Sequence, residues 1–235
     1  MIEVRGLCKE FGPKRVLSGI DLTVRQGESL CILGQSGTGK SVLLRCMLGL
    51  ESPDSGEILW NGRPLGEDRG MFLGGFGMLF QGAALFDSLP VWKNVAFKLM
   101  QRMPAAKARG IAIDKLARVG LSADTADLMP AELSGGMAKR VGLARAIADD
   151  PEVIFFDEPT TGLDPIRARR INQLIHDIVQ ETGATAITIT HDMETVRKVA
   201  RRVLLLQDGA VAWSGLVGDM DAAPQMSEFL GKTGL

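Results

Sequence analysis

The feature that most constrains this chain is the string GQSGTGKS at 34–41, which separates an apolar run from an amphipathic one. The preceding run SLCIL at 29–33 has the continuous hydrophobicity of a strand buried on both faces. The following segment, 39–51, reads as a helix that is apolar almost all round, and Pro53 and Gly56 stop its continuation. A glycine-rich turn between such a strand and helix lets backbone N–H groups curl around phosphate oxygens, in front of the positive end of the helix. The string therefore predicts a phosphate-binding P-loop.

Two side chains in this loop carry specific expectations. Lys40 would reach the β- and γ-phosphates of a bound nucleotide, and the Ser41 hydroxyl would ligate Mg²⁺. The remaining loop residues would bind phosphate through their backbone, namely Gly34, Gln35, Ser36, Gly37, Thr38 and Gly39. A glycine-rich turn with a chance lysine is the alternative, and the flanking strand and helix favour the nucleotide site.

The order of elements along the chain predicts an α/β fold. Alternating apolar and polar residues at 2–5 and 20–25 indicate strands with one wet face. After residue 150, apolar strands alternate with helices, which implies a parallel sheet covered on both faces. The expected elements there are strands at 152–158 and 184–192, helices at 164–183 and 193–202, and a strand pair at 203–215. The middle of the chain, roughly 86–149, is mostly helical by pattern and would be a lobe inserted into the sheet domain.

Polar side chains stand directly after two of these strands. Asp157 and Glu158 end the run VIFF, where the crevice of such a sheet binds its ligand. Asp157 then suits a contact to Mg²⁺, and Glu158 could orient the attacking water. His191 follows the strand AITIT and could donate a hydrogen bond to the γ-phosphate. Taken alone, the two acids could form a solvated turn and the histidine a helix cap, but a P-loop in the same domain favours the functional interpretation.

Composition limits the class of protein. The 235 residues are 46% apolar and 23% charged, which is ordinary for a globular domain. The net charge of −1 gives no basic surplus for nucleic acid. Three cysteines without metal-type spacing fit buried thiols in a reducing compartment. The first residues lack the apolar run of a signal peptide, so we expect a cytosolic chain that reaches a membrane through a partner.

A second stretch has the chemistry of an anion site. At 133–148 the chain reads LSGGMAKRVGLARAIA, in which Ser134, Gly135 and Gly136 open a basic helix. The N-terminus of a helix offers free N–H groups and a partial positive charge. The alternative is an N-cap turn before an ordinary helix, which we would favour if no other motif were present.

Taken together, these pieces resemble the ATP-binding cassette ATPases over essentially the whole chain. GQSGTGKS is similar to their Walker A motif, LSGGM to the signature, VIFFDE to Walker B, and TGLD at 161–164 to the D-loop. Gln81 in MLFQGAALF stands where the family has its Q-loop, and His191 where it has the switch histidine. The resemblance implies one domain over 1–235. Its P-loop NTPase core would have a RecA-like, mostly parallel sheet and an antiparallel β subdomain over 1–84 and 150–235, with a helical subdomain at about 85–149.

The resemblance also implies a site shared between two copies of the chain. Each ATP, with Mg²⁺, would lie between Lys40 of one copy and the Ser134 helix end of the other, so that ATP closes the dimer and hydrolysis loosens it. Phe11 would stack on adenine, with Val16 beside it. The resemblance assigns catalytic roles to Glu158, His191, Gln81 and Lys40, and a place at the nucleotide to Asp164. It implies three Mg²⁺ contacts, from Ser41, Gln81 and Asp157.

Two longer strings, 78–99 and 128–165, resemble the cassette of Mla-type phospholipid transporters, also described as organic-solvent-resistance systems. The features are the spacing from Gly82 to Phe86 after Gln81, and methionine at 137 in place of glutamine. The connection at 65–79 is shorter than in many of those relatives. The likeness implies a cytoplasmic position on the bacterial inner membrane, two permease subunits and a periplasmic lipid-binding subunit, with outer-membrane lipid asymmetry as the task and no nucleic-acid partner.

Some points stay open at the level of sequence. The cassette could serve an amino-acid importer or a lipoprotein-release system, or act on DNA or ribosomes, although no long insertion of the kind found in such soluble cassettes is visible. A small-molecule P-loop kinase would have no need of LSGGM or TGLD. Residues 221–235 would be either a short docking helix or a loose tail. Most apolar residues after Gln81 would pack inside the lobe and a few would line a groove for a permease helix; they include Leu85, Phe86, Val91, Trp92, Val95 and Phe97.

Overall fold

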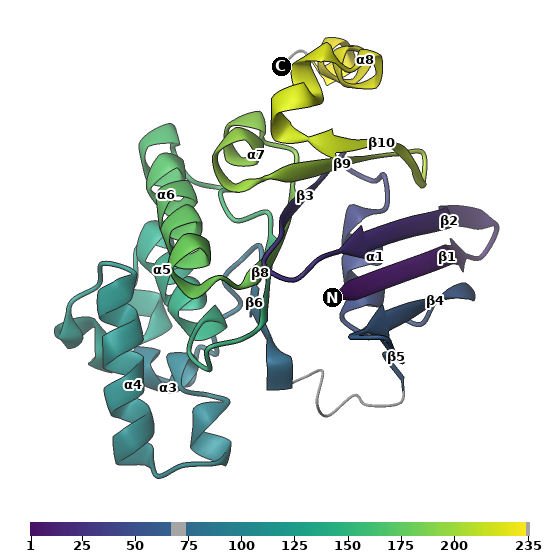
Figure 1. The fold of residues 1–235 in the computed structure, drawn as a ribbon. Coiled ribbons are helices and arrows are strands. Elements are labelled where there is room, and N and C mark those ends of the chain that lie inside the picture. Colours follow the sequence, from purple (N-terminus) through teal and green to yellow (C-terminus); the bar gives the residue numbers. More distant parts are fainter. Residues whose placement is uncertain (67–73, 234–235) are drawn as a thin grey trace. The chain divides into compact units, whose positions relative to one another are not determined.

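The computed structural model describes residues 1–66 and 74–233, which fall into two compact units. Unit 1 comprises Met1–Gly74 and Thr185–Leu235, and unit 2 comprises Gly75–Ala184. Figure 1 labels the elements of both units. Part of the connection at 65–79, residues 67–73, lies outside the described residues.

Unit 1 contains an antiparallel sheet with the strand order β2-β1-β4-β5. Its strands are β1 (Ile2–Phe11), β2 (Lys14–Val24), β4 (Ser55–Trp60) and β5 (Arg63–Pro64). Along β1 the side chains of Ile2 and Val4 are buried whereas Arg5 is exposed. This period-two burial confirms strands with one wet face, because successive side chains of a strand point to opposite faces.

A second set of strands in unit 1 runs in the order β10-β9-β3-β8. It consists of β3 (Ser29–Leu33), β8 (Thr185–Thr190), β9 (Arg202–Gln207) and β10 (Ala210–Leu216). Strand β3 pairs in parallel with both β8 and β9, and β10 closes the edge antiparallel to β9. Every residue of β3 and of β8 is buried, which confirms that these apolar runs are strands covered on both faces.

The turn between β9 and β10 packs closely on β2. Gly209 has φ +75°, and a Cβ at this position would lie 2.5 Å from the backbone oxygen of Val16. The carbonyl of Gly209 also accepts a 2.8 Å hydrogen bond from the N–H of Ser18. Only glycine fits both the backbone conformation and the approach.

Helix α1 (Lys40–Met47) is shorter than the predicted 39–51. Gly49 adopts a left-handed conformation, φ +65°, and the N–H groups of Leu50 and Glu51 bond back to the carbonyl of Arg45. Such a glycine ends a helix by satisfying its last carbonyls, so the apolar pattern continued beyond the true end of the helix.

Unit 1 ends in the helices α7 (Met193–Val199), η4 (Val217–Ala222) and α8 (Pro224–Thr233). Met226 and Phe229 of α8 are buried in one cluster with Val196 of α7 and Leu205 of β9. Figure 1 shows α8, in yellow, beyond the β9–β10 pair. The expectation of a loose tail is therefore wrong for Pro224–Thr233, because two large apolar side chains at helical spacing fix this segment to unit 1.

Unit 2 contains two parallel strands, β6 (Phe76–Leu79) and β7 (Val153–Asp157). Its helical elements are α3 (Val91–Val95), η1 (Leu99–Gln101), α4 (Ala105–Arg118), η2 (Ala123–Asp127), η3 (Pro130–Glu132), α5 (Gly135–Ala146) and α6 (Pro165–Thr182). Pro90 and Pro104 are the N-caps of α3 and α4, and Gly120 has φ +71° two residues after α4. These residues therefore mark where helices of the predicted helical middle begin and end.

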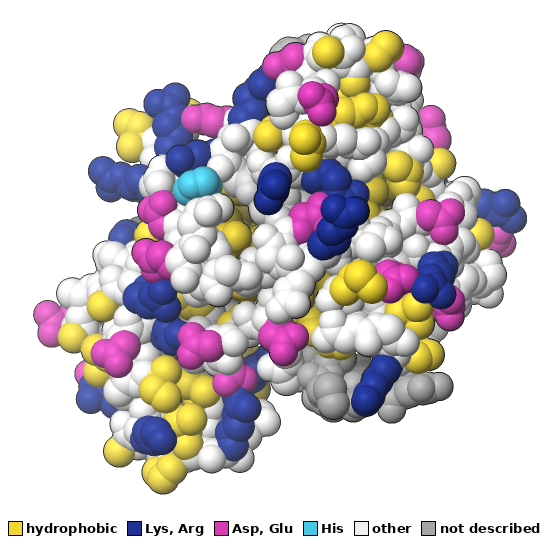
Figure 2. Space-filling model, viewed as in Figure 1, with side chains coloured by type: hydrophobic (Ala, Val, Ile, Leu, Met, Phe, Trp, Pro, Cys, Tyr) yellow, Lys and Arg dark blue, Asp and Glu magenta, His cyan; other side chains and the backbone are white. Residues whose placement is uncertain are grey.

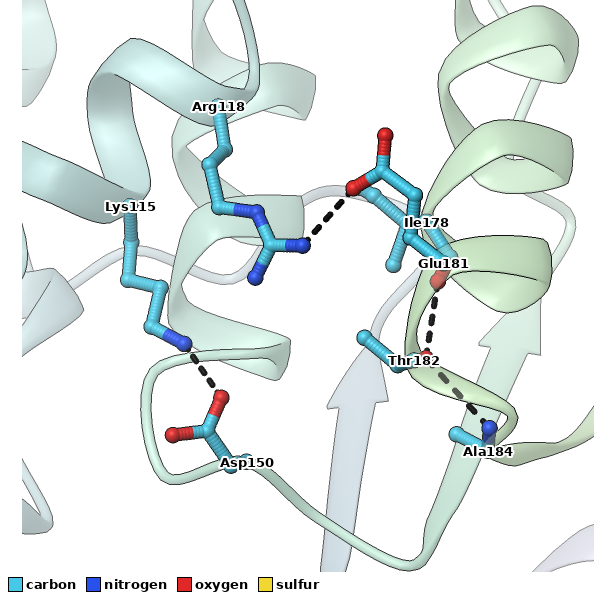
Figure 3. Close-up of polar contacts among 7 residues, drawn as sticks. All are labelled: Lys115, Arg118, Asp150, Ile178, Glu181, Thr182 and Ala184. Carbon is cyan, nitrogen blue, oxygen red and sulfur yellow. Dashed lines mark hydrogen bonds and ion pairs between the residues drawn. The ribbon is translucent and has the colours of Figure 1, made fainter.

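Charged side chains connect the helices of unit 2 (Figure 3). The Lys115 ammonium of α4 lies 2.5 Å from Asp150, in the turn before β7, and Arg118 lies 2.7 Å from Glu181 of α6. The Lys115 side chain is nearly buried, at 9% exposed, whereas Arg118 and Glu181 are exposed. We therefore expect the first contact to matter more for stability than the second, because exposed ion pairs contribute little.

The cysteines are free thiols, with Cys31 and Cys46 buried and Cys8 half-buried. Burial raises the pKa of Cys46 to about 11, so this thiol stays protonated and unreactive at neutral pH. Among the described residues, no helix combines the length and the apolar character that crossing a bilayer requires.

Gly77 in β6 offers a direct test of the packing of unit 2. A Cβ at this position would lie 1.8 Å from the backbone oxygen of Ala146, at the end of α5. We predict that Gly77→Ala lowers the free energy of unfolding by about 3 kcal/mol or more, because backbone rather than a flexible side chain must move. Gly110, exposed within α4 with open space at its Cβ position, is the matched control. Gly110→Ala should stabilise by up to about 1 kcal/mol. Urea unfolding of both variants measures the difference, and equal midpoints would contradict the packing described.

Candidate functional site

The P-loop of unit 1 is built as the sequence predicts, between β3 and α1. Gly37 and Gly39 have φ +83° and +103°, in the region that favours glycine. Gly39 is the N-cap of α1 without any side-chain cap, so the first N–H groups of this helix have no side-chain partner at the cap position. A Cβ at Gly34 would lie 2.5 Å from the carbonyl oxygen of Leu206 in β9. The glycines are therefore required by backbone conformation and by close packing.

Lys40 curls back over the loop in this structure. Its ammonium donates to the carbonyls of Gly34 at 2.7 Å and Gln35 at 2.8 Å, and the residue is 7% exposed. Thr38 closes the turn through a 2.9 Å bond from its hydroxyl to the Gln35 carbonyl. Ser41, in the first turn of α1, is exposed. The lysine thus sits at the centre of the loop, and Ser41 and the backbone groups around Gly37 face solvent.

Strand β2 contributes to the same place. A Cβ at Gly39 would lie 2.9 Å from the backbone oxygen of Val16, so Val16 and the loop are in contact. Phe11 lies at the end of β1, 47% exposed, and the Lys9 ammonium is 5.1 Å from the centre of its ring. The structure therefore brings Val16 to the P-loop, and it presents the Phe11 ring to solvent with a cation at one face.

His191 stands directly after β8 and is exposed. The turn that holds it is fixed by Asp192, the N-cap of α7. The Asp192 carboxylate accepts bonds from the N–H groups of Glu194 and Thr195, at 3.0 and 3.2 Å, and its own N–H donates to the hydroxyl of Thr190. His191 thus lies at the end of a buried strand, as predicted, and hydrogen bonds of Asp192 hold the backbone that follows it.

In unit 2, β7 ends with Asp157 and Glu158, both half-buried. Glu158 has φ +46°, an uncommon conformation for a residue other than glycine. The Thr161 hydroxyl lies 3.4 Å from the Glu158 carboxylate. The backbone of Glu158 is held in a strained turn, a condition that recurs at sites where a side chain must be aimed.

Gln81 begins the loop after β6 and is exposed. After Gly82, the residues Ala83 and Ala84 have φ +60° and +47°, so two alanines in succession adopt the left-handed conformation. The Arg145 guanidinium of α5 donates to their carbonyls at 2.5 and 2.7 Å. Those two charge-assisted bonds offset the strain of the loop.

The signature serine caps α5. Ser134 is the N-cap, and its hydroxyl accepts a 3.3 Å bond from the N–H of Met137. Ser134 and Gly135 are exposed and Gly136 is buried. Both interpretations of this segment fit the structure. Ser134 caps the helix by bonding one N–H, and the exposed turn leaves room for an anion at the helix end.

The D-loop aspartate is a cap as well. Asp164 accepts a 2.9 Å bond from the N–H of Arg167, at the start of α6, and lies 3.2 Å from the Arg167 guanidinium. The backbone bond and the nearby charge of Arg167 hold the pKa of Asp164 below its usual value. Its carboxylate is therefore ionised at neutral pH, and it serves as the N-cap of α6.

Sequence reasoning missed two cations of α5, the buried Lys139 and the half-buried Arg145. Lys139 is 6% exposed, and its ammonium donates to the backbone carbonyls of Gln81 and Glu158. Burial lowers its pKa, while the carboxylates of Asp157 and Glu158 act in the opposite direction. Burial also lowers the pKa of Arg145. The sequence showed only a basic helix here, and no local signal distinguishes a buried lysine from a solvated one.

Comparison with known proteins agrees with this geometry. The family model described as ABC transporter matches residues 17–161. The methionine import ATP-binding protein MetN of Mesorhizobium japonicum is 41% identical over 230 residues, 96% of this chain and 63% of that protein. The protein TRIGALACTOSYLDIACYLGLYCEROL 3, chloroplastic, of Arabidopsis thaliana is 39% identical over 92% of this chain and 68% of its own length. The chain thus spans about two thirds of the length of these curated relatives.

A solved structure is similar as well. The dimeric ATP-binding cassette MJ0796, in a post-hydrolysis state bound to ADP and Pi, gives a TM-score of 0.83 at 29% identity, covering 92% of this chain and 99% of that one. One assignment follows from the P-loop in unit 1 and the capped signature helix in unit 2, together with the family match and this structural similarity. The chain belongs to the ABC transporter family of ATP-hydrolysing cassettes.

Proposed function

We propose that this chain is the ATPase subunit of a membrane transporter, in which two copies close on ATP and drive a permease. The observation that carries the proposal is the exposed N-terminal turn of α5 at Ser134, a second helix end suited to phosphate besides the P-loop. The likeness to a dimeric cassette bound to ADP and Pi supports a role for both ends at one nucleotide.

The residues of the P-loop fit a triphosphate. Lys40 is already centred in the loop on two neutral carbonyl acceptors, and phosphate oxygens would replace them with stronger, charge-assisted bonds. The N–H groups from Gly37 to Ser41 would surround the β-phosphate. Phe11 and Val16 would meet the adenine ring, with Lys9 completing one face of Phe11.

The donor set proposed for Mg²⁺ fits this ion. A serine hydroxyl, an amide oxygen and a carboxylate, from Ser41, Gln81 and Asp157, are hard oxygen ligands, and Ser41 and Gln81 are exposed. When bound, Mg²⁺ would neutralise charge on the β- and γ-phosphates. Glu158 would orient the attacking water, and His191 would donate a hydrogen bond to the γ-phosphate. Ser134, Gly135 and Asp164 would complete the site from the other copy.

A groove in unit 2 fits the permease. It has a volume of about 430 Å³ and is lined mainly by aromatic and other apolar side chains, together with Lys98, Arg145 and Asp149; the aromatic members are Phe76, Phe80, Phe86 and Phe97. Phe86 and Phe97 are 44% and 38% exposed, with ring centres 4.6 Å apart. Val91 and Val95 are buried, and Val95 forms part of the wall of the groove. An apolar groove of this kind suits a short helix of the membrane subunit.

We further propose that the cargo is a phospholipid, as in Mla-type systems, and that a periplasmic lipid-binding subunit completes a complex at the bacterial inner membrane. Support comes from the strings around Gln81 and Ser134, and from one relative whose name contains that of a galactolipid. The favoured alternative is methionine or amino-acid import, which the name of another relative suggests. Nucleic acid is disfavoured, because Lys and Arg side chains are interspersed with Asp and Glu over the visible face (Figure 2).

We retain 1–235 as one cassette domain.

Isolation of the native complex would test the cargo. We predict that an affinity-tagged chain, solubilised from its own membranes with its partners, brings down a permease and phospholipid identified by mass spectrometry. A complex carrying Lys40→Ala should retain the same subunits, since the groove is remote in sequence from the P-loop. Recovery of an amino-acid-binding protein in place of the lipid-binding subunit would establish the alternative.

Hydrolysis should depend on Glu158. We predict that Glu158→Gln keeps ATP binding but slows turnover by roughly 10² to 10⁴, the range for a lost general base. Glu181→Gln is the matched control, because Glu181 is an exposed carboxylate of the same unit paired with Arg118 (Figure 3). Turnover of Mg-ATP and equilibrium binding of ATP are measured on both variants in the intact complex. Near-normal turnover of Glu158→Gln would remove this residue from the proposed role.

Two kinds of heterodimer, which carry the same two substitutions in different arrangements, test whether the site is shared between copies. A heterodimer of a Lys40→Ala chain with a Ser134→Arg chain has one site with both lesions and one intact site, so it should hydrolyse or occlude ATP. A heterodimer of the double variant with an unaltered chain has one lesion in each site and should do neither.

Both heterodimers carry the same two substitutions, so differences in stability cancel. Dual-tag purification isolates each heterodimer, and occluded nucleotide is measured beside turnover. Equal behaviour of the two arrangements would rule out a site split between copies.

A further inference from the structure

Lys139 joins three functional segments of unit 2 through one buried ammonium. It lies on α5, one turn after the signature residues, and is 6% exposed. Its ammonium donates one hydrogen bond to the carbonyl of Gln81, 58 positions away in the chain, and another of 3.4 Å to the carbonyl of Glu158. Burying an ammonium is unfavourable unless its protons find acceptors, and here the acceptors are the backbones of the two loops proposed to act on the nucleotide.

The two acceptor carbonyls belong to turns with uncommon backbone geometry. Glu158 has φ +46°, outside the regular geometry of the strand that precedes it. The loop after Gln81 contains the two left-handed alanines, and Arg145 binds their carbonyls from the same helix. Helix α5 therefore holds this loop at both ends, through Lys139 at Gln81 and through Arg145 at Ala83 and Ala84.

We propose that Lys139 is a positioning residue that fixes the Gln81 loop and the Glu158 turn to the body of α5. The assignment rests on the proposed function of Gln81 and Glu158. The N-terminus of the same helix carries Ser134, so the residue that meets the other copy's nucleotide and the residues that act on this copy's nucleotide belong to one rigid assembly. Arg145, which lines the permease groove, extends the assembly to that groove.

This arrangement gives Lys139 a role in the chemical step rather than in ATP affinity. The Lys40 loop lies in unit 1, whereas the two carbonyls that Lys139 binds belong to unit 2. Loss of the ammonium would remove one hydrogen bond from each of the carbonyls of Gln81 and Glu158, and small displacements of a reacting group cost rate steeply. The turnover number should therefore fall while the KM for ATP changes little.

The test compares two buried lysines of unit 2. Lys139→Met keeps the length of the side chain and removes its donors, whereas Lys139→Arg keeps donors. Lys115→Met is the matched control, because Lys115 as a whole residue is 7% exposed and its ammonium pairs with the carboxylate of Asp150 (Figure 3). We expect kcat of the full chain to fall at least about tenfold in Lys139→Met, to recover in Lys139→Arg, and to stay within about twofold in Lys115→Met.

Hydrogen exchange measures the same contact without any activity. In Lys139→Met, the amides of residues 82–84 and 160–161 should exchange about tenfold faster, because bonds from a charged donor are lost. In Lys115→Met these segments should keep the exchange of the unaltered chain. Should Lys139→Met fail to fold, Lys139→Gln, with a shorter amide donor, replaces it and should show the same two effects at smaller size.

The outcomes separate this inference from the proposed function. Lys139→Met and Lys115→Met with equal turnover and equal exchange would overturn the positioning role. If Glu158→Gln retained full turnover while the exchange result held, the proposed catalysis would fail and the structural coupling by Lys139 would stand.

Discussion

A loop that aims several backbone N–H groups at one point must leave the φ values that ordinary residues prefer, and the rest of this structure depends on that constraint. In the P-loop it is met by Gly37 and Gly39, and the absence of a Cβ at Gly34 lets the loop lie against β9. The buried strand β3 can then deliver the chain directly to the N-terminus of α1. No larger residue would allow the loop, the strand and the helix to coexist.

In unit 2, loops with uncommon φ values are stabilised in a different way. The turns at Glu158 and at Ala83–Ala84 are left-handed without glycine. Their carbonyls are bound by cations from α5, which supply from a distance the stabilisation that glycine supplies locally. The consequence is that unit 2 has loops whose geometry is conditional on a neighbouring helix, whereas the P-loop geometry of unit 1 is intrinsic to its sequence.

This difference explains what could be read from the sequence. The P-loop, the buried strands, and the acids ending β7 have local signatures, and glycine spacing or apolar runs reveal them. The early end of α1 at Met47 could not be read, because leucines continue past the glycine that stops the helix. The packing of α8 and the roles of Lys139 and Arg145 depend on contacts between segments far apart in the chain, for which a single sequence holds no local pattern. Family membership follows from the ordered motifs, whereas the proposed phospholipid cargo has no chemical signature among the residues of this chain.

The close approach of Gly209 to Val16 has a mechanical consequence. The carbonyl of Gly209 is bound by Ser18, and the hairpin tip abuts the strand that also touches Gly39 of the P-loop. A displacement of β2 would therefore be transmitted to the β9–β10 hairpin, and from there to α8 through the hydrophobic cluster that the hairpin and α8 share. Any ligand that moved β2 beside the P-loop would thus also shift the C-terminal helix of unit 1.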